Sequence, residues 1–374
     1  YKSSKHSKWM IKIGLLLYDF LSSFKNSPHQ ILTKEQVISK ISMINQKDLQ
    51  GGGLYYDAVM DDAKITLEVI YDALLSKKCS ALNYHEILDV KKYPEYNEVT
   101  IREVFTRKTH KTKCKNIIFS LGPFTDIVLT KIFPNFWKPV LIPSKGSHLW
   151  VKKDSIKLQH PMVINHKDGR VIFFIPHDNK VLIGTTEVES DDNIENTQAN
   201  KNELEYLIKL TNEYFPQSNF SQADILSTYS GIRPLIRDER SGSGKGKTAR
   251  THKTYQIGKN IFVIAGGKYT TFRVMGQEIT KNIVSRKNKS YSTNTTLRPL
   301  RTQSVVKNPS EWCPNQDDIA KIIEREMPRT IEDLIHRRIG VHSAGEWDML
   351  YQATPYQKFV QEVHQKHGKH FEGV

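Results

Sequence analysis

The chain has 374 residues, of which 38% are hydrophobic and 10% aromatic, so it is long enough for two or three domains with a sizeable core. This composition excludes a disordered chain. Lysine and arginine outnumber aspartate and glutamate by 55 to 40, and the net charge of +15 favours anionic partners such as phosphorylated metabolites, acidic lipid or nucleic acid. No basic motif interleaved with aromatic residues supports nucleic acid, so we expect no nucleic-acid partner. No apolar run reaches the roughly 18 residues of a membrane span.

Two helices are predicted at the start of the chain. Residues 5–24 carry apolar clusters at helical spacing, and residues 34–42 predict a second, shorter helix. The first segment begins like a secretory signal, but Lys12 and Asp19 interrupt its apolar run and no small-residue cleavage site follows, so we expect no such signal. Because the sequence starts with Tyr1 and not with methionine, we expect it to be part of a longer chain.

The next stretch predicts alternating helices and strands. A strongly helical run follows the three glycines at 51–53 and ends near Lys78. After it come segments rich in strand-forming residues, at 80–90, 98–107 and 115–119. The last of these leads through Gly122 into another helix, which is typical of a βα pattern.

Residues 140–186 have a different character and predict antiparallel strands. Turn signals at Asp168-Gly169 and Asp178-Asn179 separate short runs of strand-forming residues. A helix over 201–215 and an extended segment over 224–235 follow.

The segment 260–273 is the most informative part of the sequence, because it predicts a buried strand, a turn and the first turn of a helix. Gly266 and Gly267 allow the backbone to approach a ligand closely, and Lys268 adds a positive charge. The threonines at 270–271 are predicted to cap the helix, whose positive end suits an anionic group. An ordinary tight turn between a strand and a helix is the alternative.

A second glycine-rich loop, at 241–248, resembles a phosphate-binding loop of nucleotide triphosphatases. That pattern needs glycine where Ser241 stands, and it needs a strand before the loop, which the charged residues at 237–240 do not form. We interpret the segment as a basic surface loop.

No metal site is expected. The carboxylates Asp57, Asp61 and Asp62 have no partner ligand at a matching spacing, and acidic residues at the start of a helix favour its positive end. The cysteines are odd in number, far apart and without a CxxC pair, which argues against a disulfide framework or zinc and for a reducing compartment; they are Cys79, Cys114 and Cys313.

Two further residues are candidates for chemistry. His148 follows Gly146 at the start of a predicted antiparallel strand, and its imidazole titrates near neutrality, although a lone histidine is more often structural. Arg233 lies between apolar neighbours and directly before Pro234, which predicts a partly buried guanidinium that needs an anion. The alternative for Arg233 is an internal salt bridge.

Taken in order, a series of segments resembles the FAD-dependent glycerol-3-phosphate dehydrogenase family. The likeness covers nearly the whole chain, and the series is more specific than any single motif. The segments are Gly14-Leu-Leu-Leu-Tyr-Asp-Phe-Leu21, 52–64, Gly122-Pro-Phe-Thr-Asp126, Pro143-Ser-Lys-Gly-Ser-His148, 170–176, Ile183-Gly-Thr-Thr186, Tyr229-Ser-Gly-Ile-Arg-Pro-Leu235, Arg250-Thr-His252 and Ala265-Gly-Gly-Lys-Tyr-Thr-Thr-Phe-Arg273.

The resemblance implies an α/β flavoprotein of the glutathione-reductase and D-amino-acid-oxidase type, with an antiparallel substrate sheet and a helical C-terminal module. It implies oxidation of sn-glycerol 3-phosphate to dihydroxyacetone phosphate, a step of glycerol metabolism. A hydride passes from C2 to flavin N5, and the electrons then pass to quinone. Such chemistry needs a base for the C2 hydroxyl and cations for the phosphate.

The resemblance also implies roles for particular residues. His148 would contact the substrate hydroxyl and accept its proton, Arg233 and Arg250 would bind the phosphate, and Lys268 would stabilise negative charge between flavin and substrate. The residues that would line FAD are Gly122, Gly266, Gly267, Tyr269 and Thr270.

The sequence departs from the family at its start. Members begin with a strand and a G-x-G-x-x-G turn that holds the FAD pyrophosphate, and neither is present here, so we expect the first dinucleotide-binding βαβ unit to be absent and FAD to be held poorly. Two readings therefore stay open besides the dehydrogenase: an oxidase of the same fold that reduces oxygen, and a non-catalytic remnant.

The domain boundaries follow from these assignments. We expect a helical cap segment at 1–50, a partial FAD-binding domain at 51–134 and 221–287, and an antiparallel substrate-binding domain at 135–220. A linker at 288–309 precedes a helical C-terminal domain at 310–374. The family implies a peripheral membrane surface and a homodimer as partners. The location would be the cytoplasmic face of the membrane, or the mitochondrial inner membrane in a eukaryote.

Overall fold

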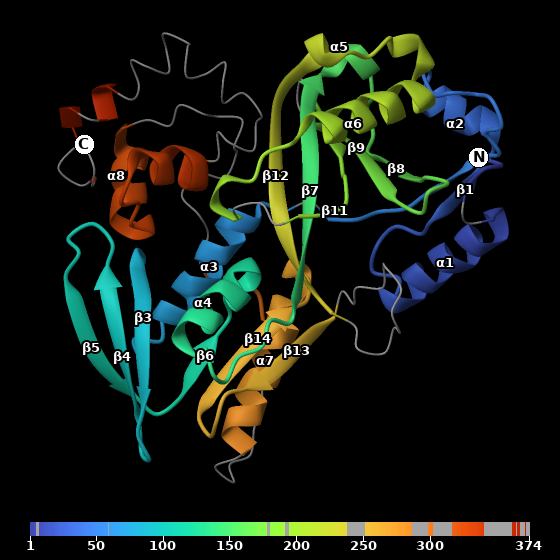
Figure 1. Cartoon of the computed structure of the whole chain (residues 1–374). Coiled ribbons are helices and arrows are strands. Elements are labelled where there is room, and N and C mark those ends of the chain that lie inside the picture. Colours follow the sequence, from blue (N-terminus) through green and yellow to red (C-terminus); the bar gives the residue numbers. More distant parts are fainter. Residues whose placement is uncertain are drawn as a thin grey trace.

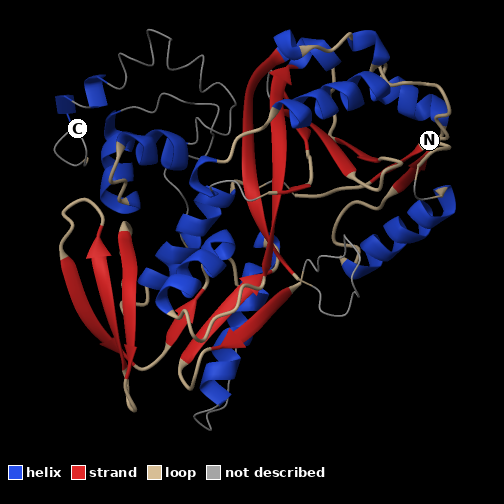
Figure 2. Ribbon diagram, in the orientation of Figure 1, coloured by secondary structure: helices blue, strands red, loops and turns tan. Residues whose placement is uncertain are grey.

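The computed structural model describes residues 1–4, 7–58, 60–177, 180–190, 194–237, 251–285, 298–301, 316–339, 361–363, 365–366 and 371. A large antiparallel sheet with its helices occupies the upper right of Figures 1 and 2. Shorter strands and helices lie below it and to its left. Helices and strands both occur along the described chain, in agreement with the predicted α/β class.

Strand β7 has partners along both of its edges in the large sheet. It pairs with β10 and β11 along one edge and with β12 along the other, and every one of these pairings is antiparallel. Strands β9 and β8 extend the sheet beyond β10. The strands are β7 (Leu141–Lys152), β8 (Met162–Asn165), β9 (Val171–His177), β10 (Lys180–Gly184), β11 (Val188–Glu189) and β12 (Ile225–Ile236).

The prediction of antiparallel strands over 140–186 is confirmed, although the turn at Asp178-Asn179 lies outside the described residues. Strand β12 falls in the range 221–287, which was predicted to belong to the other domain. It nevertheless pairs with β7 from Ile225 to Ile236, so this strand joins the two predicted domains. The domain boundaries themselves stay a prediction.

The main core lies between this sheet and helix α6 (Lys201–Tyr214), which confirms the helix expected over 201–215. Leu207 and Leu210 on α6 are buried in one cluster with Leu149 of β7 and Phe174 of β9. The short helix α5 (Lys153–Ile156) connects β7 to the rest of the sheet. Single 3-10 turns at Ile194–Asn196, Pro216–Ser218 and Gln222–Asp224 flank α6.

The N-terminal residues fold against this region. The predicted helices are present as α1 (Lys8–Leu21) and α2 (Lys34–Lys40). Strands β1 (Gln30–Leu32) and β2 (Gly52–Leu54) pair antiparallel, and helix α3 (Asp62–Leu74) begins the next region. The Asn45 side chain donates to the backbone oxygen of Glu213 at 2.7 Å, which fastens this segment to the end of α6.

A smaller sheet that contains one pair of parallel strands forms the second region. Strand β14 (Ile261–Gly266) pairs parallel with β6 (Ile117–Phe119) and antiparallel with β13 (His252–Gln256). Helix α4 (Thr125–Ile132) follows β6, and helix α7 (Phe272–Ser285) follows β14. The turns between them contain 3-10 helices at Gly122–Phe124 and Tyr269–Thr271.

The βα pattern expected over residues 80–119 is wrong in part. Strands β3 (His85–Lys92), β4 (Asn97–Glu103) and β5 (Thr109–Cys114) form a separate antiparallel sheet, and only β6 joins the parallel pair. Strand β5 was not predicted, because its residues are almost all polar and exposed and so lack the alternation that marks a half-buried strand.

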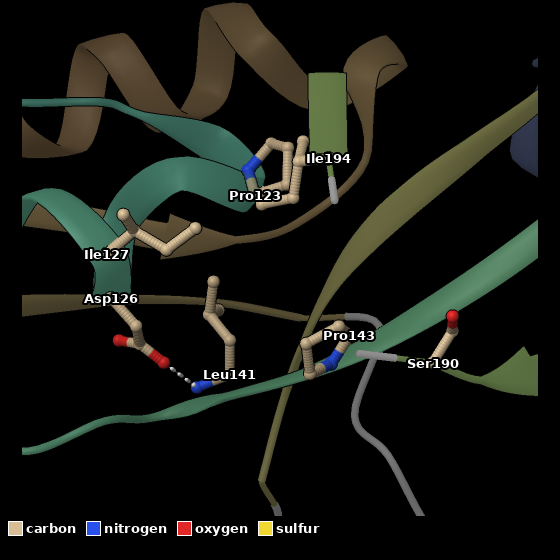
Figure 3. Close-up of a pocket in the computed structure, with 7 residues that line it drawn as sticks. All are labelled: Pro123, Asp126, Ile127, Leu141, Pro143, Ser190 and Ile194. Atoms are coloured by element: carbon tan, nitrogen blue, oxygen red, sulfur yellow. Dashed lines mark hydrogen bonds between the residues drawn. The ribbon is translucent and has the colours of Figure 1, made fainter. Parts of the chain in front are cut away.

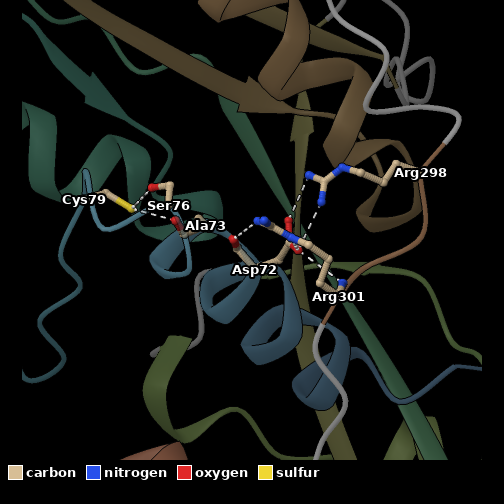
Figure 4. A network of polar contacts seen from close by, with 6 residues as sticks. All are labelled: Asp72, Ala73, Ser76, Cys79, Arg298 and Arg301. Atoms are coloured by element: carbon tan, nitrogen blue, oxygen red, sulfur yellow. Dashed lines mark hydrogen bonds and ion pairs between the residues drawn. The ribbon is translucent and has the colours of Figure 1, made fainter.

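The C-terminal module contains helix α8 (Gln316–Glu326) and a π-helix over Asp333–Ile339. In Figure 4, Asp72 on α3 accepts hydrogen bonds from Arg298 and Arg301, and the two guanidinium groups hold the pKa of its carboxyl well below the usual range. Tyr84 donates to Asp333 at 2.7 Å. The contact of Tyr84 joins the module to the β3–β5 region, and Arg298 and Arg301 join the residues before the module to α3.

No helix among the described residues is both long enough and apolar enough to span a bilayer.

Candidate active site

The strand pair β7 and β12 brings the two predicted chemical residues onto one face. In the antiparallel register His148 lies opposite Tyr229, and Arg233 lies opposite Ser144. Because side chains alternate along a strand, His148, Tyr229 and Arg233 point to the same side of the sheet, which we call the site face. The imidazole of His148 stacks on the phenol ring of Tyr229, with 4.7 Å between ring centroids and 9° between the ring planes.

Two glycines make room for these side chains. A Cβ atom on Gly184 of β10 would collide with the imidazole of His148, and a Cβ atom on Gly146 of β7 would collide with the guanidinium of Arg233. The guanidinium therefore lies across the bare backbone of β7. At Gly146 the group that approaches the backbone is the side chain of Arg233.

The loop after β10 holds Arg233. One guanidinium nitrogen donates to the Thr185 hydroxyl at 2.7 Å, and the other donates to the backbone oxygen of Thr186 at 3.4 Å. The arginine is half-buried and its guanidinium stays charged at neutral pH, so a positive charge lies on the site face.

The environment of His148 keeps its imidazole neutral. Burial, and then the positive charge of Arg233, lower the pKa of His148 to about 4. Its Nδ1 atom is buried and makes no hydrogen bond within the described part of the chain. Burial also raises the pKa of Tyr229 to about 12, so this phenol stays protonated at neutral pH. At neutral pH the site face thus presents a neutral base beside a permanent cation.

The glycines that are predicted to approach a ligand lie at the ends of the two parallel strands, and we call Gly122, Gly266 and Gly267 the glycine cradle. Gly122 follows β6, and Gly266 and Gly267 end β14, so these glycines lie at the same edge of the sheet. All three have positive φ angles, of 55°, 73° and 86° in chain order, which other residues rarely adopt. A Cβ atom on Gly122 would point into open space. Ligands of open α/β sheets bind at such an edge.

Packing at the end of β12 joins the cradle to the β7–β12 pair. Ile236 forms a small buried cluster with Leu141 of β7 and Ala265 of β14, and it also fills the space beside Gly266. Arg233 lies three residues before Ile236, which is roughly 10 Å along an extended strand, and its side chain points to the opposite side of that strand.

The start of helix α3 provides a second connection. Tyr269, in the turn after β14, donates to the backbone oxygen of Asp62 at 2.8 Å. The charge of Asp62 is also felt by Tyr229 on the site face. Tyr269 and the exposed residues Lys268 and Thr270 thus lie on the turn that connects the cradle to the site face.

One detail of the cradle was predicted wrongly. The threonines at 270–271 belong to a 3-10 turn, and the Thr271 hydroxyl donates to the backbone oxygen of Lys268 at 2.8 Å instead of accepting from a helix N–H group. The turn begins at Lys268 without a side-chain cap. Arg250, which is predicted to bind the substrate phosphate, lies outside the described residues, and so does the basic loop at 241–248.

A small cavity of about 210 Å³ lies next to the cradle (Figure 3). Its walls come from the start of α4, from β7 and from the residues after β11; they are Pro123, Asp126, Ile127, Leu141, Pro143, Ser190 and Ile194. Asp126 accepts hydrogen bonds from Trp137 at 2.9 Å and from the backbone of Leu141 at 2.8 Å. This carboxylate fixes the start of β7, and the rest of the lining is mostly apolar.

No group of three or more His, Cys, Asp or Glu side chains suited to a metal ion is found in the part of the chain that the structure describes.

Residues 8–311 match the model of the family described as FAD dependent oxidoreductase. The chain belongs to this family. It is 29% identical over 334 residues to the aerobic glycerol-3-phosphate dehydrogenase of Staphylococcus aureus, an alignment that covers 86% of this chain and 59% of that protein. The chain thus spans less than two thirds of the length of the curated relatives it matches.

Solved structures show the same fold. The glycerol-3-phosphate dehydrogenase of Bacillus halodurans complexed with FAD superimposes with a TM-score of 0.69 at 21% identity, covering 90% of this chain and 78% of that one. Glycine oxidase from Geobacillus kaustophilus gives a TM-score of 0.52 at 16% identity, with 79% and 73% covered. These neighbours confirm the predicted flavoprotein fold.

The residues of the cradle fit one end of FAD. Three positive-φ glycines lie at the edge of a parallel strand pair, the space beside Gly122 is open, and the exposed Lys268 adds positive charge. The roles predicted for individual residues at this site stay predictions.

Sequence reasoning missed several members of the site. Tyr229, Thr185 and Thr186 were recognised only as parts of family segments, and Gly184 was given no role. A signal was available at Gly184, because a glycine within an otherwise apolar strand often marks a close approach of another group.

Proposed function

We propose that the chain carries the substrate-binding half of an FAD-dependent enzyme that oxidises sn-glycerol 3-phosphate to dihydroxyacetone phosphate. The observation that carries this proposal is the neutral imidazole of His148 beside the guanidinium of Arg233, on a sheet face that leads to the glycine cradle. The likeness to glycerol-3-phosphate dehydrogenases of two bacteria supports the substrate. Because only part of those proteins is matched, the activity of the whole protein is part of the proposal.

The reaction assigns a task to each group on the site face. FAD, when bound, supplies the acceptor for the hydride that leaves C2. His148 accepts the proton of the C2 hydroxyl, because its imidazole is neutral at neutral pH. Arg233 binds the phosphate through its guanidinium, and Lys268 lies on the cradle side, where negative charge develops.

The stack on Tyr229 and the bare position at Gly184 fix the plane of the His148 ring. A base held in one orientation needs no rearrangement when the substrate arrives. The apolar neighbours of β7 and β12 exclude water from the back of this face, which keeps the imidazole in its uncharged form.

For the electron acceptor we propose a quinone. The curated relatives are named dehydrogenases and not oxidases, which favours an acceptor other than oxygen. An oxidase of the same fold would instead release hydrogen peroxide. The yield of peroxide per turnover decides between the two.

A membrane surface is the partner that we propose from helix α1. Its residues Ile11 and Leu15 pack on Gly53 of β2, whereas the opposite side of the helix is entirely apolar and each of its side chains is more than half exposed. Those exposed residues are Trp9, Met10, Ile13, Leu16, Leu17, Phe20 and Leu21. Nearby lysines, among them Lys8 and Lys12, are exposed or half-exposed and favour anionic lipid.

Such a helix would place the protein on the cytoplasmic face of the membrane, or on the inner membrane of a mitochondrion. The alternative is that the apolar side of α1 is buried in a homodimer. The oligomeric state in solution and with liposomes distinguishes a homodimer from membrane binding.

The test of the proposed function is a visible spectrum. The chain is incubated with FAD and desalted, and the spectrum is recorded before and after addition of glycerol 3-phosphate without oxygen. A retained flavin spectrum that bleaches with substrate supports the proposal. Retained flavin without bleaching contradicts the substrate assignment, and loss of flavin on desalting indicates a chain that does not hold the cofactor by itself.

A further inference from the structure

The reverse side of the β7–β12 pair carries a buried polar network that the proposed chemistry does not use. Lys145 and Ser147 of β7 point away from the site face, toward helix α6. Glu203 on α6 meets them there. Lys145 and Glu203 are each 3% exposed, Ser147 is fully buried and Thr186 is 1% exposed.

Glu203 is the centre of this network. Its Oε1 atom accepts hydrogen bonds from the hydroxyls of Ser147 at 2.8 Å and Thr186 at 2.7 Å. Its Oε2 atom pairs with the Lys145 ammonium group at 3.1 Å and accepts from the backbone N–H of Asn200 at 3.0 Å. Each carboxylate oxygen of Glu203 therefore contacts two donors within the interior of the protein.

The network ends at Arg233. The Thr186 hydroxyl bonds Glu203 and also accepts the backbone N–H of Ser147 at 2.8 Å, while the backbone oxygen of Thr186 accepts from Arg233. Thr185, which takes the other guanidinium nitrogen, donates to that same backbone oxygen at 2.9 Å. Residues 185 and 186 are thus held between Glu203 on one side and Arg233 on the other.

Helix capping does not account for this arrangement. The capping box of α6 needs Asn200 and a single oxygen of Glu203. The bonds to Ser147, Thr186 and Lys145 are additional, and they require a charged group to be buried. Buried ion pairs contribute little to stability, but they can fix one geometry among several, because an alternative packing leaves a charge unpaired.

We propose that Glu203 is a positioning residue for the anion site: it holds residues 185 and 186 so that the guanidinium of Arg233 lies across Gly146 and beside His148. The proposal rests on the proposed function for its substrate, glycerol 3-phosphate. Its geometric part, the dependence of Arg233 on Glu203, stands on the contacts alone.

Three variants test the proposal. Glu203→Gln removes the negative charge and replaces one acceptor oxygen by an NH₂ group, so on either side of the carboxylate two donors lose their acceptor. Thr186→Val removes the hydroxyl that connects Glu203 to the loop without changing any charge, and Thr186→Ser keeps that hydroxyl. Glu205→Gln is the matched control, because Glu205 lies on the same helix, is exposed and pairs only weakly with Lys201 at 3.8 Å.

The first readout is the dissociation constant of glycerol 3-phosphate, measured by calorimetry on protein saturated with FAD. We expect Glu203→Gln and Thr186→Val to weaken the binding of glycerol 3-phosphate by about tenfold. Thr186→Ser should keep most of the affinity, and Glu205→Gln should change it by less than about twofold. In an Arg233→Lys background, Glu203→Gln should add no further loss. An equal loss in that background overturns the proposal, because Glu203 would then act independently of Arg233.

The second readout needs neither substrate nor cofactor. The charge of Arg233 contributes to the lowered pKa of His148, so a displaced guanidinium raises that pKa, which NMR titration of the imidazole measures. We expect a rise in Thr186→Val and in Glu203→Gln and none in Glu205→Gln. Loss of the Glu203 charge alone would lower the pKa, so a rise identifies movement of Arg233. An unchanged titration in folded Thr186→Val protein overturns the proposal.

The two readouts separate the possible failures. If the unmodified protein binds no glycerol 3-phosphate, the proposed function fails, and the titration still decides whether Glu203 positions Arg233.

Discussion

The imidazole of His148 lies flat against the phenol ring of Tyr229, 4.7 Å away between centroids, across the β7–β12 pair. The two residues come from distant parts of the sequence, and only the register of the strands brings them together. This stack determines the plane of the only proposed base on the site face, and several predictions depend on it.

Replacing Tyr229 tests the stack. Tyr229→Phe keeps an aromatic ring against His148, whereas Tyr229→Leu removes it, and we expect the leucine variant to unfold more easily by about 1 kcal/mol than the phenylalanine variant. Urea unfolding measures this difference. Substrate oxidation should fall further in Tyr229→Leu as well, because the imidazole loses its fixed plane. Equal stability and equal turnover of the two variants would show that the ring contact has no role.

The lowered pKa of His148 predicts a pH dependence of stability. The folded protein binds a proton at His148 only below about pH 4, whereas the unfolded chain binds it below about 6.5, so the unfolded state holds more protons between these values. Stability therefore rises with pH through this window, is fully present above 6.5 and is lost as the pH falls, by at most about 3 kcal/mol.

Urea unfolding at pH 7 and pH 5 measures this effect by comparison with His148→Asn, which should show a smaller loss at pH 5. His160→Asn is the control, because His160 is exposed. If His148→Asn and the unmodified protein lose the same amount between the two values, the imidazole of His148 is not held in its neutral form.

Glycine substitutions on the strand pair test the room left for Arg233. Gly146→Ala places a methyl group where the guanidinium lies, so we expect a destabilisation of about 1–3 kcal/mol and weaker binding of glycerol 3-phosphate. Gly231 lies directly opposite on β12, and a Cβ atom there meets nothing within 4 Å. Gly231→Ala should therefore change stability by less than about 1 kcal/mol. A similar cost at both positions would contradict the placement of Arg233.

Charge on the exposed side of α1 should abolish lipid binding. Ile13→Glu with Leu17→Glu adds two negative charges to the apolar side, and we expect pelleting with vesicles of anionic phospholipid to fall at least tenfold without loss of stability. The control Ile127→Glu with Val274→Glu adds the same charge at exposed positions of α4 and α7. Unchanged pelleting of the α1 variant, or equal loss in the control, would argue for a different cover of this helix.

Much of the fold was predictable because the helices have strong apolar periodicity. Helices α1, α2 and α6 were expected within a few residues of their bounds, since one side of each carries regular apolar positions. Strand β5 was missed, because its residues are polar and exposed and give no local signal.

The site could be predicted only in its parts. His148 and Arg233 were chosen from their own neighbours, but their common face depends on the antiparallel register of β7 and β12, which a single sequence does not reveal. Glu203 looked like an ordinary acidic residue in the first turn of a helix. Its burial against Lys145 and Thr186 is a property of the tertiary structure alone.

The β7–β12 pair has a mechanical consequence. Each strand is 12 residues long, and the pair runs unbroken from the stacked base to the cluster of Leu141, Ile236 and Ala265 beside the cradle. The spacing between His148 and the cradle is therefore set by a fixed length of hydrogen-bonded strand pair and not by a loop. Lengthening each of the two strands by two residues would move His148 away from the cradle by roughly 6–7 Å while keeping its side chain on the same face.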